Sequence, residues 1–183
     1  MSKTKLRSVR LALLLLLSVT IASMNSWAQS GIDSAGRTEF SRNIPKPDHY
    51  VNDFEQVLED EEELQLNRLA ANVAKQTGMQ FAIVTLKKDM VGTEPFDSLM
   101  FRIFNTWRVG EQGKNNGVVI GLSQSMQKVR ITLGLGIPLT NQETQKILDE
   151  IMLPYLRKAG LATAVREGIQ QLVTNIERNG YHR

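Results

Sequence analysis

The chain has 183 residues, of which 22 are basic and 19 acidic, for a formal net charge of +3. It contains no cysteine, which excludes disulfides, thiol catalysis and zinc sites of the cysteine type. Four basic and no acidic residues lie within residues 1–28, so the remainder carries 18 bases against 19 acids, a formal charge of −1. This balance argues against nucleic acid as a partner.

Residues 1–28 have the pattern of a secretory signal peptide. Basic residues precede an apolar run from Leu11 to Ala22, and small or polar residues follow up to Ala28. The run is shorter than the roughly 20 residues that cross a bilayer. We expect cleavage after Ala28, a periplasmic or otherwise exported protein, and no membrane span after cleavage. The alternative is that the segment is retained as an N-terminal membrane anchor.

Residues 29–48 are rich in Ser, Gly, Asn and Pro and predict a flexible linker, with a strap on the domain surface as the alternative. The folded domain is expected over residues 49–178, with a short tail at residues 179–183. After a short extended piece, acids at Glu59–Glu63 begin a helical pattern, where they favour the positive end of the helix dipole. Gly78 is a plausible stop for this helix.

Two nearly continuous apolar runs, at residues 80–87 and 117–122, predict strands buried on both faces. A helix from about Pro95 separates them, with apolar residues spaced at three and four. Residues 108–116, which follow this helix, predict a polar loop. Residues 128–133 alternate apolar and polar side chains, which indicates a half-exposed strand in a hairpin with the preceding one.

The C-terminal part predicts two helices. Thr140 and Glu143 have the spacing of a capping box at the start of the first. Pro154 is expected to kink or end that helix. A last helix begins at about Leu161 and stops at Asn179 and Gly180. Helices between buried strands imply parallel pairs, so the predicted fold is α/β: a Rossmann-like three-layer α/β/α sandwich with a mixed sheet of about four strands.

An ordered set of short motifs resembles the TPM domain family over about residues 50–176. The motifs are Asn-Asp-Phe at 52–54, the segment 77–85, Trp-Arg-Val-Gly at 107–110, Gly-Lys-Asn-Asn-Gly and the strand after it at 113–120, Lys-Val-Arg-Ile at 128–131, Gly-Leu-Gly at 134–136, Leu-Thr at 139–140 and Pro154.

The resemblance implies a Rossmann-like α/β/α sandwich on the non-cytoplasmic side of a membrane. Relatives include a thylakoid-lumen protein tied to photosystem II repair and many bacterial exported proteins, some labelled methanol dehydrogenase. Acid phosphatase activity and divalent-metal binding are proposed for members of the family.

The family's candidate site implies that three loops gather in one crevice at the carboxyl ends of parallel strands, where α/β proteins usually bind ligands. The helix start at Thr140 would offer N–H groups to an anion, and Asp53 an oxygen to Ca²⁺ or Mg²⁺. The candidate ligand-binding residues are Asp53, Lys114, Asn116, Gly134, Gly136, Thr140 and Asn141.

Each candidate also has a structural interpretation. Asp53 can cap the turn into the first helix, the glycines can provide backbone freedom, and Lys114 can be a solvated loop lysine. The sequence also departs from the family pattern: Leu135 stands where relatives have an aromatic residue, Pro138 enters the loop, which is about two residues shorter, and Asn141 replaces an Asp. With that carboxylate missing, a metal at Asp53 would bind weakly.

Two hypotheses for the function follow. The first is a non-catalytic interaction or maintenance module in the cell envelope, whose partner is an envelope or membrane protein. The second is a divalent-metal-assisted phosphoesterase of the acid phosphatase type that uses Asp53. A weaker, third possibility is a small-anion sensor at the Thr140 helix start.

Overall fold

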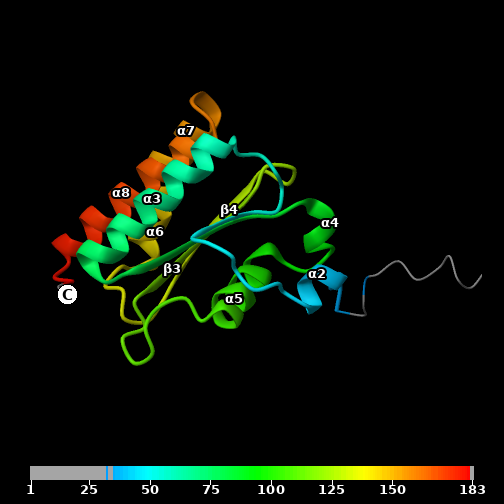
Figure 1. The fold of residues 1–183 in the computed structure, drawn as a ribbon, viewed down its shortest axis with the longest axis horizontal. Helices are drawn as coiled ribbons and strands as arrows, with labels where there is room; N and C mark the ends of the chain where they lie inside the picture. The colour runs from blue at the N-terminus through cyan, green and yellow to red at the C-terminus, as the bar shows by residue number, and fades with distance from the viewer. Residues whose placement is uncertain (1–31, 33–34, 182–183) are drawn as a thin grey trace, which may run out of the picture.

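The computed structural model describes residue 32 and residues 35–181, so the predicted signal peptide lies outside the described residues. None of the described helices is both long and apolar enough to cross a membrane. Helices separate the first three strands, the fourth strand follows the third directly, and helices complete the domain (Figure 1). The elements are α2 (Glu39–Arg42), β1 (Val51–Asp53), α3 (Asp60–Thr77), β2 (Gln80–Thr85), α4 (Lys88–Val91), α5 (Phe96–Trp107), β3 (Gly117–Ser123), β4 (Lys128–Leu133), α6 (Asn141–Lys146), the π-helical turn η1 (Ile147–Met152), α7 (Leu153–Lys158) and α8 (Leu161–Arg178).

The four strands form one mixed sheet in the order β1-β2-β3-β4. β1 and β3 both pair with β2 in parallel, because a helical connection returns the chain each time, whereas β3 and β4 form an antiparallel hairpin. In this register Asp53 lies beside Thr85, and Gly117 lies beside Gln80. The predicted mixed sheet of four strands is confirmed.

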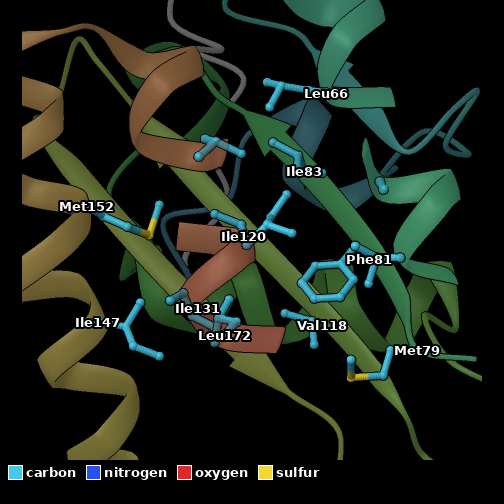
Figure 2. Packing of buried hydrophobic residues seen from close by; sticks show 14 of the residues in the cluster. Leu66, Met79, Phe81, Ile83, Val118, Ile120, Ile131, Ile147, Met152 and Leu172 are labelled. Atoms are coloured by element: carbon cyan, nitrogen blue, oxygen red, sulfur yellow. The ribbon is translucent and has the colours of Figure 1, made fainter. Parts of the chain in front are cut away.

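Helices cover both faces of the sheet, because β2 and β3 are apolar on both sides. Phe81 and Ile83 of β2 pack into a core under α3, α8 and the α6–η1 helix, as Figure 2 shows together with Ile120 of β3. Ala82 and Val84 point the other way, into a second core under α4 and α5. This alternation at period two produces three layers, and the predicted α/β sandwich is confirmed.

Two predicted helix boundaries have the expected local geometry. α3 ends at Thr77, and Gly78 follows in the left-handed conformation at φ 77°, where glycine carries no steric cost. α6 begins after Thr140, whose hydroxyl accepts the Glu143 N–H while the Glu143 carboxylate accepts the Thr140 N–H. The capping box read from the sequence is therefore present.

Residues 35–48 lie as a strap against the face that carries α4 and α5. The Trp107 indole N–H donates to the Pro45 carbonyl oxygen at 2.7 Å. The Phe40 ring meets the edge of Phe54, with ring centroids 5.2 Å apart. For residues 35–48 the structure therefore has the surface strap that the sequence left as the alternative, and the expected flexible linker is corrected there, because apolar residues in the strap reach the second core.

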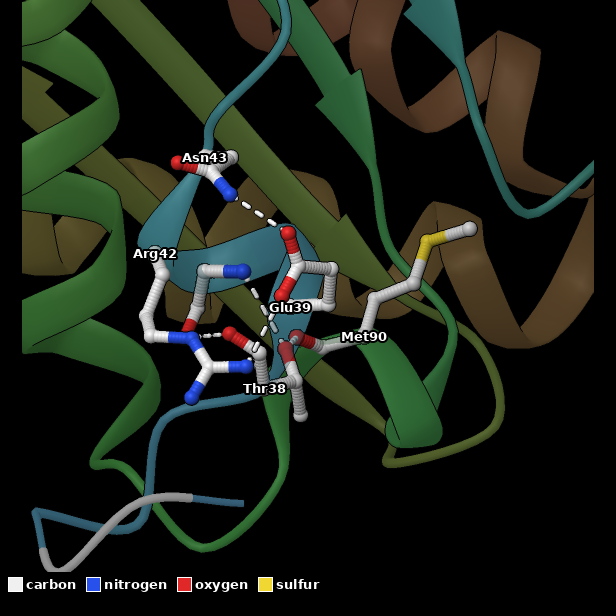
Figure 3. A network of polar contacts seen from close by, with 6 residues as sticks. Thr38, Glu39, Arg42, Asn43 and Met90 are labelled. Carbon is white, nitrogen blue, oxygen red and sulfur yellow. Dashed lines mark hydrogen bonds and ion pairs between the residues drawn. The ribbon is translucent and has the colours of Figure 1, made fainter. Parts of the chain in front are cut away.

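The helical part of the strap is held by its own polar contacts (Figure 3). The Thr38 hydroxyl donates to the Met90 carbonyl oxygen and accepts the Ser41 N–H. The Glu39 carboxylate accepts hydrogen bonds from Arg42 and Asn43. The Arg42 guanidinium, followed by the Asn43 amide, lowers the pKa of Glu39 below its ordinary value. The Thr38 hydrogen bond ties the start of α2 to α4, and the Glu39 contacts hold α2 together internally.

The helix that contains Pro154 does not end there. It passes from α6 through the π-helical turn η1 into α7, which reaches Lys158. Within the wide turn the Leu153 N–H donates to the Leu148 carbonyl oxygen, five residues back. In a regular α-helix the proline ring would meet the carbonyl of residue 150, so a wider turn lets the helix continue past Pro154.

Gly121 of β3 lies where α5 packs closely against the sheet. A Cβ added at this position would lie 1.8 Å from Met100 Sδ. We predict that Gly121→Ala lowers the free energy of unfolding by about 1 to 3 kcal/mol through overpacking. The measurement is the urea midpoint at unchanged slope.

Met100→Ala provides the control for this clash. Alone it removes a buried side chain and destabilises the protein, but in the Gly121→Ala background it also removes the overlap. The double variant should therefore be more stable than the sum of the two single effects. Strict additivity would contradict the proposed contact.

Candidate functional site

The structure separates the predicted site residues into groups at opposite ends of the strands. These two ends of the sheet are called its carboxyl edge and its amino edge. Asp53 ends β1 at the carboxyl ends of the parallel strands, beside Thr85. The loop at residues 113–116 precedes β3, so it lies at their amino ends, where Gly117 pairs with Gln80. The length of β2 places the two edges roughly 16 Å apart, at about 3.3 Å per residue. The expected single crevice is therefore wrong, because a loop before a parallel strand and a loop after one lie at opposite edges.

The Asp53 carboxylate closes the turn between β1 and α3. Its Oδ2 accepts hydrogen bonds from the backbone N–H groups of Val57 and Leu58, both at 2.9 Å. Its Oδ1 accepts one from the Thr85 hydroxyl. Both oxygens thus have donors from within the chain, which is the geometry of a turn cap, the structural interpretation of this residue.

Glu55 is a second carboxylate at this edge, and the sequence analysis missed it. The side chain is buried, and its two oxygens accept the N–H groups of Gln124 and Ser125, each at 2.8 Å. The Glu55 N–H in turn donates to the Thr85 hydroxyl oxygen at 3.0 Å. Thr85 therefore links the two carboxylate turns. No local pattern indicates this role, because the partners of Glu55 lie 69 and 70 residues away.

At the amino edge, Asn116 joins three segments of the chain. Its side chain is buried; the amide NH₂ donates to the Gly78 carbonyl oxygen at 2.8 Å, and the amide oxygen accepts the Glu111 N–H at 2.7 Å. The Gln80 side chain continues the network by accepting the Gly110 N–H at 3.0 Å. Asn116 thus has a donor and an acceptor partner within the chain, and it stabilises the loop before β3.

Gly134 and Gly136 lie at the same edge as Asn116, because β4 runs antiparallel to β3. A Cβ at Gly134 would lie 2.1 Å from the Asn115 carbonyl oxygen, and one at Gly136 would lie 1.9 Å from the Lys114 carbonyl oxygen. The glycines therefore allow close backbone approach between two loops. The Lys114 ammonium is exposed and forms an ion pair with Glu111 at 2.7 Å, while Leu135 is 96% exposed between the glycines.

The α6 start is occupied by a carboxylate of the chain itself. Glu143 Oε2 accepts the Thr140 N–H and hydroxyl, and Glu143 Oε1 accepts the Asn179 amide, which also donates to the Pro138 carbonyl oxygen. The Asn179 hydrogen bond, followed by those from Thr140, lowers the pKa of Glu143 to about 2. Asn141 is exposed at the first position of the helix. The anion that this helix start favours is already provided by Glu143.

The described residues offer little for a divalent cation. Within residue 32 and residues 35–181, no group of three or more His, Cys, Asp or Glu side chains could hold a metal ion. Every buried side-chain nitrogen or oxygen in this part of the chain has a hydrogen-bond partner. A cation at Asp53 would have to displace the donors of Val57 and Leu58. The polar groups at both edges are thus arranged to hold loops together.

We predict that Asp53→Ala destabilises the domain by about 1.5 to 3 kcal/mol, the range for hydrogen bonds to a charged group. The substitution leaves the Val57 and Leu58 N–H groups without their acceptor. Asp60→Asn, which neutralises an exposed acid at the start of α3, is the control and should change stability little. Equal stability of Asp53→Ala and the control by urea unfolding would contradict the cap.

The Glu143 contacts predict a specific dependence on pH. Because the folded pKa is lowered from 4.5 to about 2, the charge of Glu143 stabilises the fold above pH 4.5, and this contribution is lost as the pH falls toward 2. The gap in unfolding free energy between the wild type and Glu143→Gln should therefore shrink from pH 7 to pH 2. A gap that stays constant over this range would show that the charge contributes nothing.

Comparison with known proteins identifies the family of this chain. A family model described as the TPM domain matches residues 51–175. The match runs from β1 into α8 and includes both edges described above. No curated protein matches the chain.

Solved structures have the same fold at low sequence identity. The N-terminal domain of a P. gingivalis protein, solved by NMR, is 23% identical with a TM-score of 0.62, over 79% of this chain and 93% of that one. The BA42 protein from the psychrophilic bacterium Bizionia argentinensis is 14% identical with a TM-score of 0.61, over 71% and 88% of the two chains. The N-terminal domain of the cg2496 protein from Corynebacterium glutamicum is 12% identical with a TM-score of 0.55, over 70% and 80%. With the family model matched over most of its length, this chain belongs to the TPM domain family.

Proposed function

We propose that this TPM domain acts outside the cytoplasm as a non-catalytic interaction or maintenance module for an envelope or membrane protein. Its export is proposed from the signal-peptide pattern of residues 1–28. The formal charge of −1 for the remaining residues argues for a protein partner over nucleic acid.

This proposal rests on the hydrogen bonds that Asp53 makes within its own turn. Asp53 is the acid that a catalytic or metal-binding role would require. Its carboxylate accepts two backbone N–H groups and the Thr85 hydroxyl, so a ligand would compete with three hydrogen bonds that hold the turn. Such bonds are about twice as strong as neutral ones because the acceptor is charged. A group held this way serves the stability of the fold better than it serves turnover.

The competing hypothesis is a metal-assisted phosphoesterase that uses Asp53, and the separation of the loops weighs against it. Lys114 would have to stabilise the phosphate, yet it lies at the opposite edge of the sheet from Asp53. Asn141 provides an amide where relatives have a carboxylate, so a hard cation would lack a second charged ligand there.

A thermal melt with added ligands separates the two hypotheses. We predict that millimolar Ca²⁺, Mg²⁺, Mn²⁺ or phosphate does not raise the midpoint in a way that depends on Asp53, because only a ligand that binds the folded state stabilises it. The variants are Asp53→Asn and the matched control Asp60→Asn, each measured also for turnover of an aryl phosphate. A midpoint rise, or turnover, that is present in the wild type and the control but lost in Asp53→Asn would favour the phosphoesterase.

Cross-linking in cells tests the positive side of the proposal. The full-length gene is expressed with photo-activatable residues at exposed surface positions, and the adducts are identified by mass spectrometry. A reproducible adduct with one envelope protein is expected. The same background adducts at every position, with no specific partner, would contradict an interaction module.

A further inference from the structure

β4 is an edge strand whose outer side has no partner strand. The Gly134 N–H donates to the Gly117 carbonyl oxygen at 2.8 Å, which fixes the alternation of the antiparallel ladder. Counting from this pair in steps of two, Arg130 and Lys128 bond to β3, while the N–H and C=O groups of Val129 and Ile131 point outward. Within the described part of the chain, no backbone hydrogen bond engages these outward groups of Val129 and Ile131.

Two hollows lie along the first half of this free edge. One, of about 440 Å³, is lined by residues of the β3–β4 turn, α7 and the start of α8; the other, of about 480 Å³, is lined by residues of α5, α6 and η1. Both include residues 127–129 and Leu153, so they adjoin at the edge of the sheet. The second hollow is bounded by helices from both faces and reaches Arg130. Ile131 is only 3% exposed, so the outer side of β4 is accessible at residues 128–130 and covered beyond them.

The two sides of this edge differ in chemistry. Lys128 and Arg130 are exposed and lie on the α5 side, where the Arg130 guanidinium forms a long ion pair of 3.4 Å with Asp97. Val129 points to the other side, where Leu153 and Leu156 of α7 line the hollow. One side is therefore basic and the other apolar.

We propose that the outer edge of β4 binds an extended segment of a partner protein in which acidic and apolar residues alternate. The segment pairs as a short fifth strand with residues 128–130, bonded to the outward groups of Val129, with its acids beside Lys128 and Arg130 and its apolar side chains over Leu153. This inference rests on the proposed interaction module and names its surface and the chemistry of its partner. Charge complementarity sets the orientation of the added strand, because side chains alternate at period two.

The basic side chains of Lys128 and Arg130 disfavour a second copy of this chain as the partner at this edge. Antiparallel pairing of two β4 edges would bring Lys128 and Arg130 of one chain close to the same residues of the other, and like charges across strands are destabilising. Basic residues on an edge strand oppose such self-pairing. An acidic strand turns the same charges into attraction.

The edge is also held rigid before any partner arrives. The Glu55 carboxylate holds the N–H groups of Gln124 and Ser125 in the turn that leads into β4. The Ser125 hydroxyl oxygen accepts the Lys88 N–H at 3.2 Å, which ties the same turn to α4. A preformed edge reduces the ordering cost of adding a strand.

Hydrogen exchange of the full-length protein, purified from expressing cells and mixed with defined peptides, tests the proposal. The probe is a seven-residue peptide in which glutamate and valine alternate, and its control has lysine in place of glutamate. The amide of Val129 should exchange about tenfold more slowly when the acidic peptide is at ten times its dissociation constant, because exchange then requires release. No slowing at millimolar peptide, or equal slowing with the lysine peptide, would overturn the proposal.

Charge reversal provides the matched variants. The double variant Lys128→Glu/Arg130→Glu should lose the protection by the acidic peptide and gain protection by the lysine peptide. Its control, Lys46→Glu/Arg68→Glu, reverses two exposed charges elsewhere and should behave as the wild type. Loss of protection in both double variants would mean that only net charge matters and would overturn the proposal.

A photo-cross-linker placed at Gln127 or at Arg68 separates this inference from the proposed function. A partner adduct from Gln127 that disappears with the Lys128→Glu/Arg130→Glu change supports the edge. An adduct from Arg68 alone overturns the edge while the interaction module stands. If no exposed position gives a specific adduct, the interaction module itself is contradicted. Binding of the acidic peptide would in that case show an edge that has no partner in the cell.

Discussion

The hydrogen bonds of the Asp53 carboxylate hold together the turns at the carboxyl edge of the sheet. β1 has only three residues, so its pairing with β2 contributes few ladder bonds, and the turn after it must be held by a side chain. Asp53 holds that turn and also binds Thr85, whose hydroxyl accepts the Glu55 N–H; Glu55 then fixes the β3–β4 turn. A short chain of hydrogen bonds thus connects both outer strands across the sheet.

In the part of the chain that the structure describes, the buried polar side chains are hydrogen-bonded, and the outer side of β4 has no partner strand. At the amino edge Asn116 and the two close-packed glycines tie the loops together in the same manner. The outer edge of β4, the surface proposed for recognition, combines unpaired backbone groups with a basic side and an apolar side. A module that binds through such an edge needs a rigid sheet more than it needs a reactive side chain.

Features that depend on neighbouring residues could be predicted from the sequence, and features that depend on distant ones could not. Gly78 and the Thr140–Glu143 pair marked helix ends because their partners lie within one turn. The strap was predicted only as the alternative to a flexible linker, because the acceptor of the Trp107 indole, Pro45, is 62 residues away. The position of the 113–116 loop was misjudged through the assumption that motifs of one family share one crevice, although a loop before a parallel strand lies at its amino end.

The most direct test of this account is an NMR titration of the full chain with Ca²⁺ and Mg²⁺ that follows the amide signals of Val57 and Leu58. These two N–H groups report whether the Asp53 carboxylate stays on the turn. The account predicts that their shifts remain unchanged up to millimolar cation. Saturable shifts of both amides, accompanied by Thr85, would mean that a cation takes the carboxylate from the turn and that the edge is a ligand site after all.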